Sequence, residues 1–289
     1  MKHICLFLFG ALLAMGIPIG GAVTRDFTID PTQSSVALSG DVAGITFKEQ
    51  APGSLSTSYS GTITLGLTDA TVQITAGAMN AAVSGDWLPG PNGQGGAAPA
   101  DYGAQASIPF GTATAALRNI LLDLSSPTAT LTNGSFDAGS IVFSFSATSA
   151  AKLDYNAGFL GSGSTNLAGN ATNKTATIAT LTSVGGTDTL VINIDATFKA
   201  SLLAHDDSSL HILGKITAHG KTAPRFIDVE VVDHEIRFKI EGDITGFKLE
   251  STSDYLHWNE RQPEIVIENN VPTYKLPATA DFEFFRFTS

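Results

Sequence analysis

The stretch Ile192-Asn193-Ile194-Asp195-Ala196-Thr197-Phe198-Lys199-Ala200-Ser201-Leu202 alternates apolar and polar residues without a break. Successive side chains of an extended strand point to opposite faces, so this pattern gives one apolar face and one polar face. The stretch therefore predicts a strand that packs one side on a hydrophobic core and leaves the other side in water.

Shorter alternations of the same kind run through the chain between turns rich in Gly and Asn. They occur at Ile63/Leu65/Leu67, Val72/Ile74, Ile141/Phe143/Phe145, Leu210/Ile212/Ile216 and Ile236/Phe238/Ile240. Residues 229–232 and 235–240 flank the pair Asp233-His234, which predicts a hairpin with a tight turn. We therefore expect an all-β protein, built as a large β-sandwich or barrel domain followed by a small C-terminal β-sandwich.

Three segments depart from the strand pattern. Residues 112–124 predict one or two turns of helix, because apolar residues recur at helical spacing at Ala113, Ala116, Leu117, Ile120, Leu121 and Leu124. Residues 89–103 and 158–173 are rich in Gly and have no apolar period, so we expect two long exposed loops there. Loops of this length in compact domains are either functional or disordered.

The first 22 residues have the features of a secretory signal peptide. Lys2 and His3 precede an apolar run over residues 4–15, and Gly20-Gly21-Ala22 supplies the small residues that signal peptidase requires. The run is shorter than the roughly 20 apolar residues that span a bilayer. We expect export to the periplasm or the extracellular space, without stable insertion in a membrane.

Charge density divides the rest of the chain. Residues 26–200 hold five Lys or Arg and twelve Asp or Glu, whereas the shorter stretch 201–289 holds nine and fifteen. Pro224 and its small neighbours interrupt the strand pattern between Lys221 and Arg225. We therefore expect a signal peptide at residues 1–22, a large β domain at 23–222 and a small β-sandwich module at 223–289.

Composition argues against several kinds of function. Cys5, the only cysteine, lies in the expected leader, so the exported chain would have no thiol, disulfide or thiolate metal ligand. The formal net charge is -11, and no basic cluster is present to bind nucleic acid. His211 and His219 would lie about 26 Å apart on an extended strand, too far to share one ion. We expect neither a metal nor a cofactor.

No catalytic motif stands out. The G-x-S-x-G elbow of serine hydrolases does not occur. A carboxylate pair for sugar hydrolysis is defined by separation in space, and a single Asp more often caps a turn. The aspartates that could enter such a pair include Asp86, Asp101, Asp123 and Asp137. The sequence favours a non-catalytic protein and leaves an enzyme as a third alternative.

Three aromatic residues are candidates for stacking on sugar rings, namely Trp87, Tyr255 and Trp258. Trp87 borders the Gly-rich segment, so we expect it to be the more exposed of the two tryptophans. Trp258 ends a strand-like segment, where packing in a core is the commoner role. A polysaccharide or a cell-surface matrix is the partner that these residues suggest.

The C-terminal part resembles a small β-sandwich module that often ends secreted multidomain bacterial proteins. The resemblance rests on GFKLESTSDYLHW (246–258), YKLP (274–277) and FFRF (284–287). The preceding part resembles the low-charge β domains of exported proteins with a PEP-CTERM sorting tail, in blocks such as GSLSTSYSGTI (53–63) and ADYGA (100–104). The Pro-Glu-Pro motif of that tail is absent, so this resemblance implies free secretion and no enzymatic role.

A second resemblance is to the YceI-like family of lipocalin-type barrels. It rests on FTIDPTQSSV (27–36), SGTI (60–63) and GKITAHGKT (214–222), with Gln33 where the family usually has His. This resemblance implies a closed barrel that binds an isoprenoid or another apolar ligand. The leading hypothesis remains a secreted, non-catalytic surface or matrix-associated protein, with the lipid carrier and a polysaccharide-binding or polysaccharide-acting protein as alternatives.

Overall fold

The structure is a computed structural model of the chain. It describes residues 23–42, 45–68, 70–109, 111–170, 172–174, 178–184, 186–199, 209–221, 224–232, 235–241, 244, 248–254, 256–268, 271–277 and 284–288. The expected signal peptide, Tyr255 and the pair Asp233-His234 lie outside these residues.

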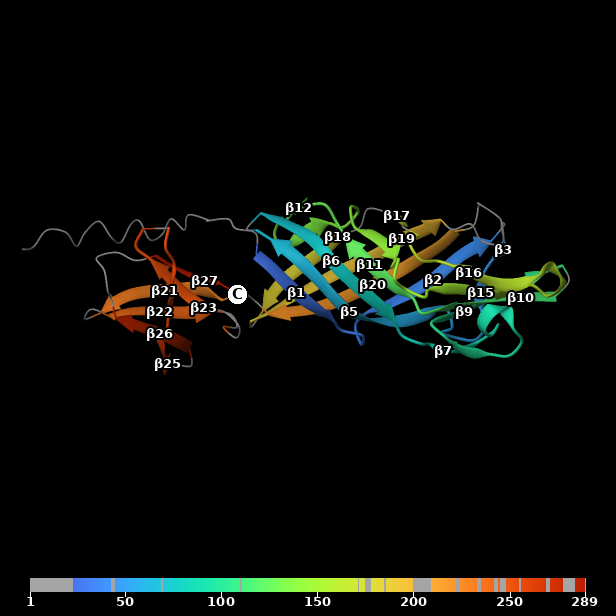
Figure 1. Cartoon of the computed structure of the whole chain (residues 1–289), viewed down its shortest axis with the longest axis horizontal. Coiled ribbons are helices and arrows are strands. Elements are labelled where there is room, and N and C mark those ends of the chain that lie inside the picture. Colours follow the sequence, from blue (N-terminus) through green and yellow to red (C-terminus); the bar gives the residue numbers. More distant parts are fainter. Residues whose placement is uncertain are drawn as a thin grey trace, which may run out of the picture.

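Antiparallel strands build the described part of the chain, which confirms the all-β fold class (Figure 1). The helical elements found there are two short 3-10 turns, η1 (Pro91–Gly93) and η2 (Gly158–Leu160). Within the same residues, no helix is long and apolar enough to cross a membrane.

The largest sheet has 13 strands, and its main path runs β13-β18-β19-β20-β1-β5-β6-β11-β14. β2 pairs with both β20 and β5, whereas β3, β12 and β17 each pair with one strand of the sheet. The 13 strands are β1 (Val23–Ile29), β2 (Ser35–Val42), β3 (Ile45–Thr46), β5 (Ser56–Leu67), β6 (Thr71–Ala81), β11 (Leu121–Ser125), β12 (Ala129–Thr130), β13 (Ser135–Asp137), β14 (Val142–Phe145), β17 (Thr172–Lys174), β18 (Ile178–Val184), β19 (Thr187–Lys199) and β20 (Ser209–Lys221).

Residues 192–199 of the stretch that predicts the fold lie in β19, and residues 200–202 lie outside the described part of the chain. β19 pairs with β20 in one unbroken register, from Thr187 opposite Lys221 to Lys199 opposite Ser209. Ile192 and Ile194 are buried and Asn193 between them is exposed. The predicted half-buried strand is therefore confirmed as far as Thr197, and the strand itself continues to Lys199.

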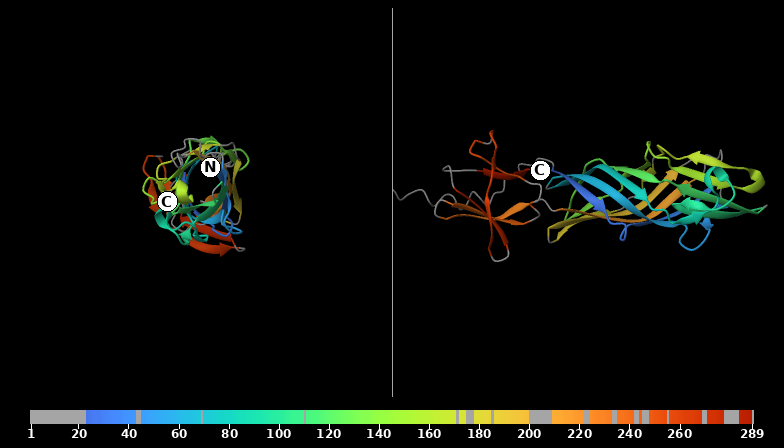
Figure 2. Two further views of the ribbon diagram at one scale, coloured as in Figure 1. Left: turned by 90° about the vertical axis from the view of Figure 1, so that its right-hand side faces the viewer. Right: turned by 60° about the horizontal axis from the view of Figure 1, so that its bottom comes forward.

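The large sheet curves around one hydrophobic core (Figure 2). Phe136 of β13 and Phe143 of β14 come from opposite ends of the strand order, yet they belong to the same buried cluster as Phe27 of β1. The right-handed twist of strands makes wide open sheets curl, so a sheet of this width can bury its own apolar face.

A five-stranded sheet adds to this core at one end of the large sheet (Figure 1). Its order is β16-β15-β10-β9-β4, and Tyr102, Leu117 and Leu153 from it join the same buried cluster. The strands are β4 (Lys48–Glu49), β9 (Tyr102–Ile108), β10 (Gly111–Arg118), β15 (Lys152–Asn156) and β16 (Ser162–Asn166). The two-stranded sheet of β7 (Gly85–Trp87) and β8 (Ala98–Ala100) lies beside β9 and β10.

The helix predicted over residues 112–124 is wrong. β10 and β11 occupy these residues, with a turn at Asn119, whose φ of 57° is left-handed. Leu122 and Leu124 face Phe145 and Phe143 of β14 across the sheet. A short apolar stripe fits a helix and two strands equally well, and pairing with neighbouring strands decided between them.

The prediction of two long exposed loops, at residues 89–103 and 158–173, is also wrong in part. Residues 89–103 contain η1, β8 and the start of β9, and Pro89, Gly90 and Gly93 are buried. Residues 158–173 contain η2, β16 and the start of β17. Gly-rich composition hid these elements because Gly has no side chain from which an apolar period could be read.

Strand pairing and the hydrophobic core both change after β20. Ile236, Phe238, Ile240, Leu249, Tyr274 and Leu276 form a second buried cluster. It lies between a four-stranded sheet, β21 (Arg225–Val232), β22 (Glu235–Glu241), β26 (Val271–Pro277) and β25 (Glu264–Glu268), and a three-stranded sheet, β24 (Asn259–Arg261), β23 (Lys248–Thr252) and β27 (Phe284–Thr288). Val232 pairs with Glu235, which confirms the predicted hairpin. The expected boundary at residue 222 falls between β20 and β21.

Candidate functional site

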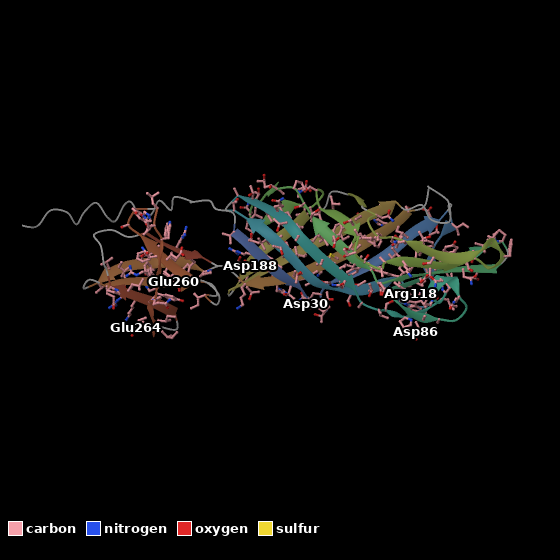
Figure 3. All side chains as sticks on the ribbon, in the orientation of Figure 1. Asp30, Asp86, Arg118, Asp188, Glu260 and Glu264 are labelled. Carbon is pink, nitrogen blue, oxygen red and sulfur yellow. The ribbon has the colours of Figure 1, made fainter. Side chains whose placement is uncertain are left out.

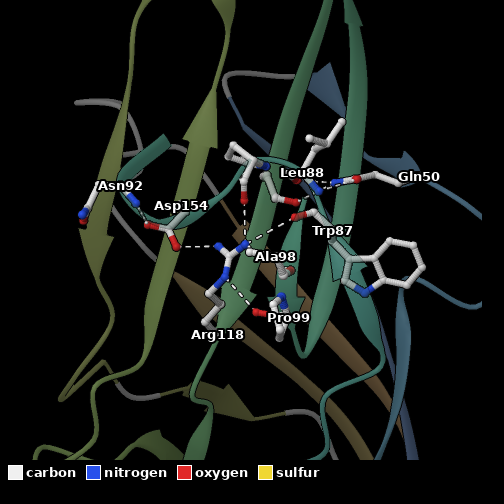
Figure 4. Close-up of polar contacts among 10 residues, drawn as sticks. Gln50, Trp87, Leu88, Asn92, Ala98, Pro99, Arg118 and Asp154 are labelled. Atoms are coloured by element: carbon white, nitrogen blue, oxygen red, sulfur yellow. Dashed lines mark hydrogen bonds and ion pairs between the residues drawn. The ribbon is translucent and has the colours of Figure 1, made fainter. Parts of the chain in front are cut away.

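The Gly/Pro-rich segment around β7, η1 and β8 is held in place by one buried arginine (Figure 4). We call residues 84–100 the platform. Arg118 of β10 has a side chain only 9% exposed. Its Nε donates to the carbonyl of Pro99 at 3.0 Å, and its Nη2 donates to the carbonyls of Pro89 at 2.6 Å and Trp87 at 3.3 Å. One guanidinium therefore fastens both ends of the platform to the five-stranded sheet.

Asp154 of β15 completes this arrangement. Its side chain is 1% exposed, its Oδ2 accepts a bond from Arg118 Nη1 at 2.6 Å, and its Oδ1 accepts one from the backbone N–H of Asn92 at 2.9 Å. Buried charges are tolerated only when they are paired and hydrogen-bonded. Both conditions are met here, and the ion pair links η1 to β15 and β10.

Gln50 holds the platform from the other side. Its Oε1 accepts a bond from the N–H of Leu88 at 2.9 Å, and its Nε2 donates to the carbonyls of Ala104 at 2.9 Å and Ala115 at 3.2 Å. The same nitrogen also donates to the carbonyl of Leu88. The backbone at Leu88 is therefore anchored to β9 and β10 through one side chain.

Trp87 is the candidate residue that the platform presents. Its side chain is half-buried, and its Nε1 donates to Ser84 Oγ at 2.8 Å. A Cβ on Gly103 would lie 2.4 Å from Trp87 Cγ, and one on Gly85 would lie 2.6 Å from Trp87 Cζ2. The indole therefore rests directly on glycine backbone. Amphipathic aromatic surfaces of this kind can stack on apolar ring faces.

Trp258 has a different environment. It is half-buried, and the guanidinium carbon of Arg286 lies 4.0 Å from the centre of its ring. Arg286 Nε also donates to Glu250 Oε2 at 2.8 Å. A cation from the same chain thus covers one face of this indole. Trp87 lies in β7, whereas Trp258 directly precedes β24. The third candidate, Tyr255, lies outside the described residues.

Side chains on the outer face of β20 form two hydrogen-bonded groups that the sequence analysis missed. His211 Nδ1 lies 3.2 Å from Ser39 Oγ, and its Nε2 lies 2.7 Å from Asp195 Oδ1. His219 Nδ1 lies 3.1 Å from Thr189 Oγ1, and its Nε2 lies 3.8 Å from Asp30 Oδ2. Only the strand register brings these residues together, so no local motif could have revealed them.

Ser39, His211 and Asp195 are hydrogen-bonded in the same sequence of groups as the Ser-His-Asp triad of hydrolases. The backbone around Ser39, however, does not provide an oxyanion hole. Acyl transfer also needs N–H donors that converge on the developing oxyanion. β2 has strands along both edges near Ser39, since it pairs with β20 and the N–H of Leu38 donates to the carbonyl of Leu55. The amides around Ser39 thus serve the sheet. No group of three His, Cys, Asp or Glu suited to a metal ion occurs in the part of the chain that the structure describes.

The four candidate aspartates have separate environments. Asp86 is exposed on the platform, at the same end of the large sheet as Arg118 (Figure 3). Asp137 accepts a bond from the N–H of Gly139 at 2.7 Å, the turn-capping role expected for such a residue. Asp101 is buried and accepts the N–H of Ile120 at 2.8 Å, and burial raises its pKa to about 6. Asp123 lies in β11.

Two buried tyrosines meet in the core of the large sheet. The hydroxyls of Tyr59 and Tyr102 lie 3.1 Å apart, and Tyr102 donates to the carbonyl of Val36 at 3.1 Å. Burial raises the pKa of both phenols. Leu117 and Phe145 help to line a small cavity beside them. The centre of a water molecule can move within about 10 Å³ of this cavity, so it has room for roughly one water.

No protein-family model, curated protein or solved structure matches this chain. The resemblances to exported β proteins of the PEP-CTERM type and to the YceI-like family therefore stay predictions.

Proposed function

We propose that this protein acts without catalysis, as an exported β protein at the cell surface or in the extracellular matrix. The observation that carries the proposal is the use of its buried charges. Arg118 and Asp154 hold the platform, and Asp188 is paired with Arg25 and Ser183. These charges stabilise loops and strands, which suits a scaffold.

The expected leader supports export, and cell fractionation tests it. We expect the protein in the medium or the envelope fraction of the producing cell, with a mature N-terminus near residue 23 by N-terminal sequencing. Recovery of the protein in the cytoplasm with residues 1–22 still attached would contradict the proposal.

Polysaccharide binding through Trp87 is the second candidate. It is favoured by the half-exposed indole, which the platform holds flat on Gly103 and Gly85. A glycan array with the full chain tests it directly. We expect Trp87→Ala to weaken binding roughly tenfold, while Trp258→Ala leaves it unchanged. If neither the wild type nor the variants bind any glycan, polysaccharide binding is contradicted, and the protein acts as a scaffold without a glycan ligand.

The lipid-carrier alternative has less support. A site for a drug-sized apolar ligand takes about 300 Å³ or more. The cavity beside Tyr59 and Tyr102 has room for roughly one water. A fluorescent isoprenoid analogue should therefore show no saturable binding to the full chain.

A further inference from the structure

β16 forms an open edge of the five-stranded sheet. Among the described residues it pairs only with β15, in the register Lys152 opposite Asn166 to Asn156 opposite Ser162. Beyond the ends of this register, the N–H of Leu167 donates to the carbonyl of Ala151, and the N–H of Ala157 donates to the carbonyl of Gly161.

These two bonds determine which backbone groups of β16 face outward. Hydrogen-bonded and non-bonded residue pairs alternate along an antiparallel ladder. Gly163 and Thr165 therefore bond to β15, while the N–H and C=O groups of Ser162, Ser164 and Asn166 point away from it. These three residues are exposed, so their outward groups are available to another strand.

Most other strands that end a sheet in the described part of the chain carry features that limit such pairing. β3 and β12 have neither a charge nor a proline, but each has only two residues and so offers a short edge. A charged residue or a proline on an edge strand prevents a further strand from adding to it. Such residues are Lys48 in β4, Asp86 in β7, Pro99 in β8, Asp137 in β13, Asp228 in β21, Glu260 in β24, Glu264 in β25 and Arg286 in β27. β14 has no charge, but Phe145 at its end is bonded to Gly169 and Asn170. β16 consists of Ser, Gly, Ser, Thr and Asn alone.

The chain segment that contains β16 is uncharged and partly apolar, although Lys152 of β15 lies opposite Asn166. Residues 155–173 contain no Asp, Glu, Lys, Arg or His, although the chain has a net charge of -11. At the tip of the hairpin, next to β16, Phe159 is 68% exposed and Leu160 is 61% exposed. An acidic protein can bring two copies of this region together without setting like charges opposite one another.

We propose that β16 pairs antiparallel with β16 of a second copy of this chain, about a two-fold axis at Ser164. Ser162 of one copy then lies opposite Asn166 of the other, and each outward N–H meets an outward carbonyl. Leu160 lies next to Ala168 of the partner by the same register. A foreign peptide would need side-chain pockets for its recognition, whereas the exposed side chains of β16 are small and its pattern is centred on Ser164.

Disulfide capture tests the register. Directly opposed residues have Cα atoms about 4.5–5.5 Å apart, within the range that a disulfide spans. In the full chain with Cys5→Ser, we expect Ser164→Cys to form a covalent dimer under oxidising conditions. The control is Ser60→Cys. Ser60 is exposed but lies on β5, which has neighbouring strands on both sides, so this variant should remain monomeric. Equal cross-linking of the two variants would contradict the proposed contact.

Sedimentation equilibrium tests the association itself. We expect the wild-type chain to dimerise with a Kd below roughly 100 µM, and Ser164→Lys to weaken the dimer at least about tenfold, because each lysine would face its own copy. Ser60→Lys adds the same charge elsewhere and should leave the Kd unchanged. A wild type that stays monomeric, or a Ser164→Lys variant that dimerises as well as Ser60→Lys, overturns the proposal. Circular dichroism of each variant confirms that it is folded.

Discussion

The platform and the β15–β16 hairpin, residues 152–166, look alike in sequence but are stabilised in different ways. The platform and residues 158–166 of the hairpin are both rich in Gly and small polar residues and lack an apolar period. Buried side chains of Arg118 and Asp154 hold the platform, whereas β16 is held by the backbone ladder to β15 and ends in an exposed apolar tip. Gly content thus says little about order, which depends on what neighbouring strands supply.

Loss of the buried ion pair should have the largest effect. Arg118→Met leaves the buried carboxylate of Asp154 without its partner and frees the carbonyls of Pro89 and Pro99. We expect a loss of about 3–5 kcal/mol in the free energy of unfolding, measured in urea. Limited proteolysis should then cut within the platform.

The double variant Arg118→Met, Asp154→Leu is the control for this prediction. It removes both charges, so it should be more stable than Arg118→Met alone. If the two are equally unstable, the lost bonds to the platform carbonyls explain the effect better than the unpaired charge does.

A glycine substitution compares the two segments directly. A Cβ on Gly93, at φ 75°, would lie 2.5 Å from the carbonyl oxygen of Tyr155, whereas one on Gly158, at φ 61°, would have nothing within 4 Å. Gly93→Ala should cost about 1–3 kcal/mol more than Gly158→Ala in urea unfolding, since only the first adds a steric clash. Equal costs would show that the platform moves to accept the methyl group.

The buried Asp101, next to β8, gives the platform end of the sheet a pH dependence. Burial raises its folded-state pKa from 3.8 to about 6, so the native state holds this proton more tightly than the unfolded chain does. The stability that the protonated Asp101 contributes is fully present below pH 4 and is lost as the pH rises through 6. Asp101→Asn should therefore gain stability relative to wild type between pH 4 and pH 7, measured by thermal unfolding. A difference that does not vary with pH would contradict this.

The smallest effect on stability should come from the hairpin tip. Leu160 is 61% exposed, so Leu160→Ser should change the free energy of unfolding by no more than about 0.5 kcal/mol. The same change should weaken self-association of the chain in sedimentation equilibrium. A large loss of stability would show that the tip is part of the core.

Strand periodicity was readable where side chains alternate. The alternation at residues 192–197 and the hairpin formed by the strands on either side of Asp233-His234 are in the structure because a period of two is a local property. The helix over residues 112–124 failed because a short stripe is ambiguous until its neighbours are known. Nothing local marked Arg118, whose five partner residues are separated from it by 19 to 36 positions.

The candidate site shows the same limit. Trp87 was found from its position beside a Gly-rich segment, but the support beneath it, Gly103 and Gly85, became visible only in three dimensions. Ser39, Asp195 and His211 are far apart in the chain and meet because β2, β20 and β19 are neighbours.

The amino-acid sequence alone determined that this is a β protein with a single cysteine, an acidic net charge and strands of alternating burial, because these follow from composition and local periodicity. Only the tertiary structure decided that the Gly-rich platform is ordered, that Arg118 holds it, and that β16 is left at an open edge. Those features depend on the register between strands distant in the chain, which backbone hydrogen bonding and burial select together.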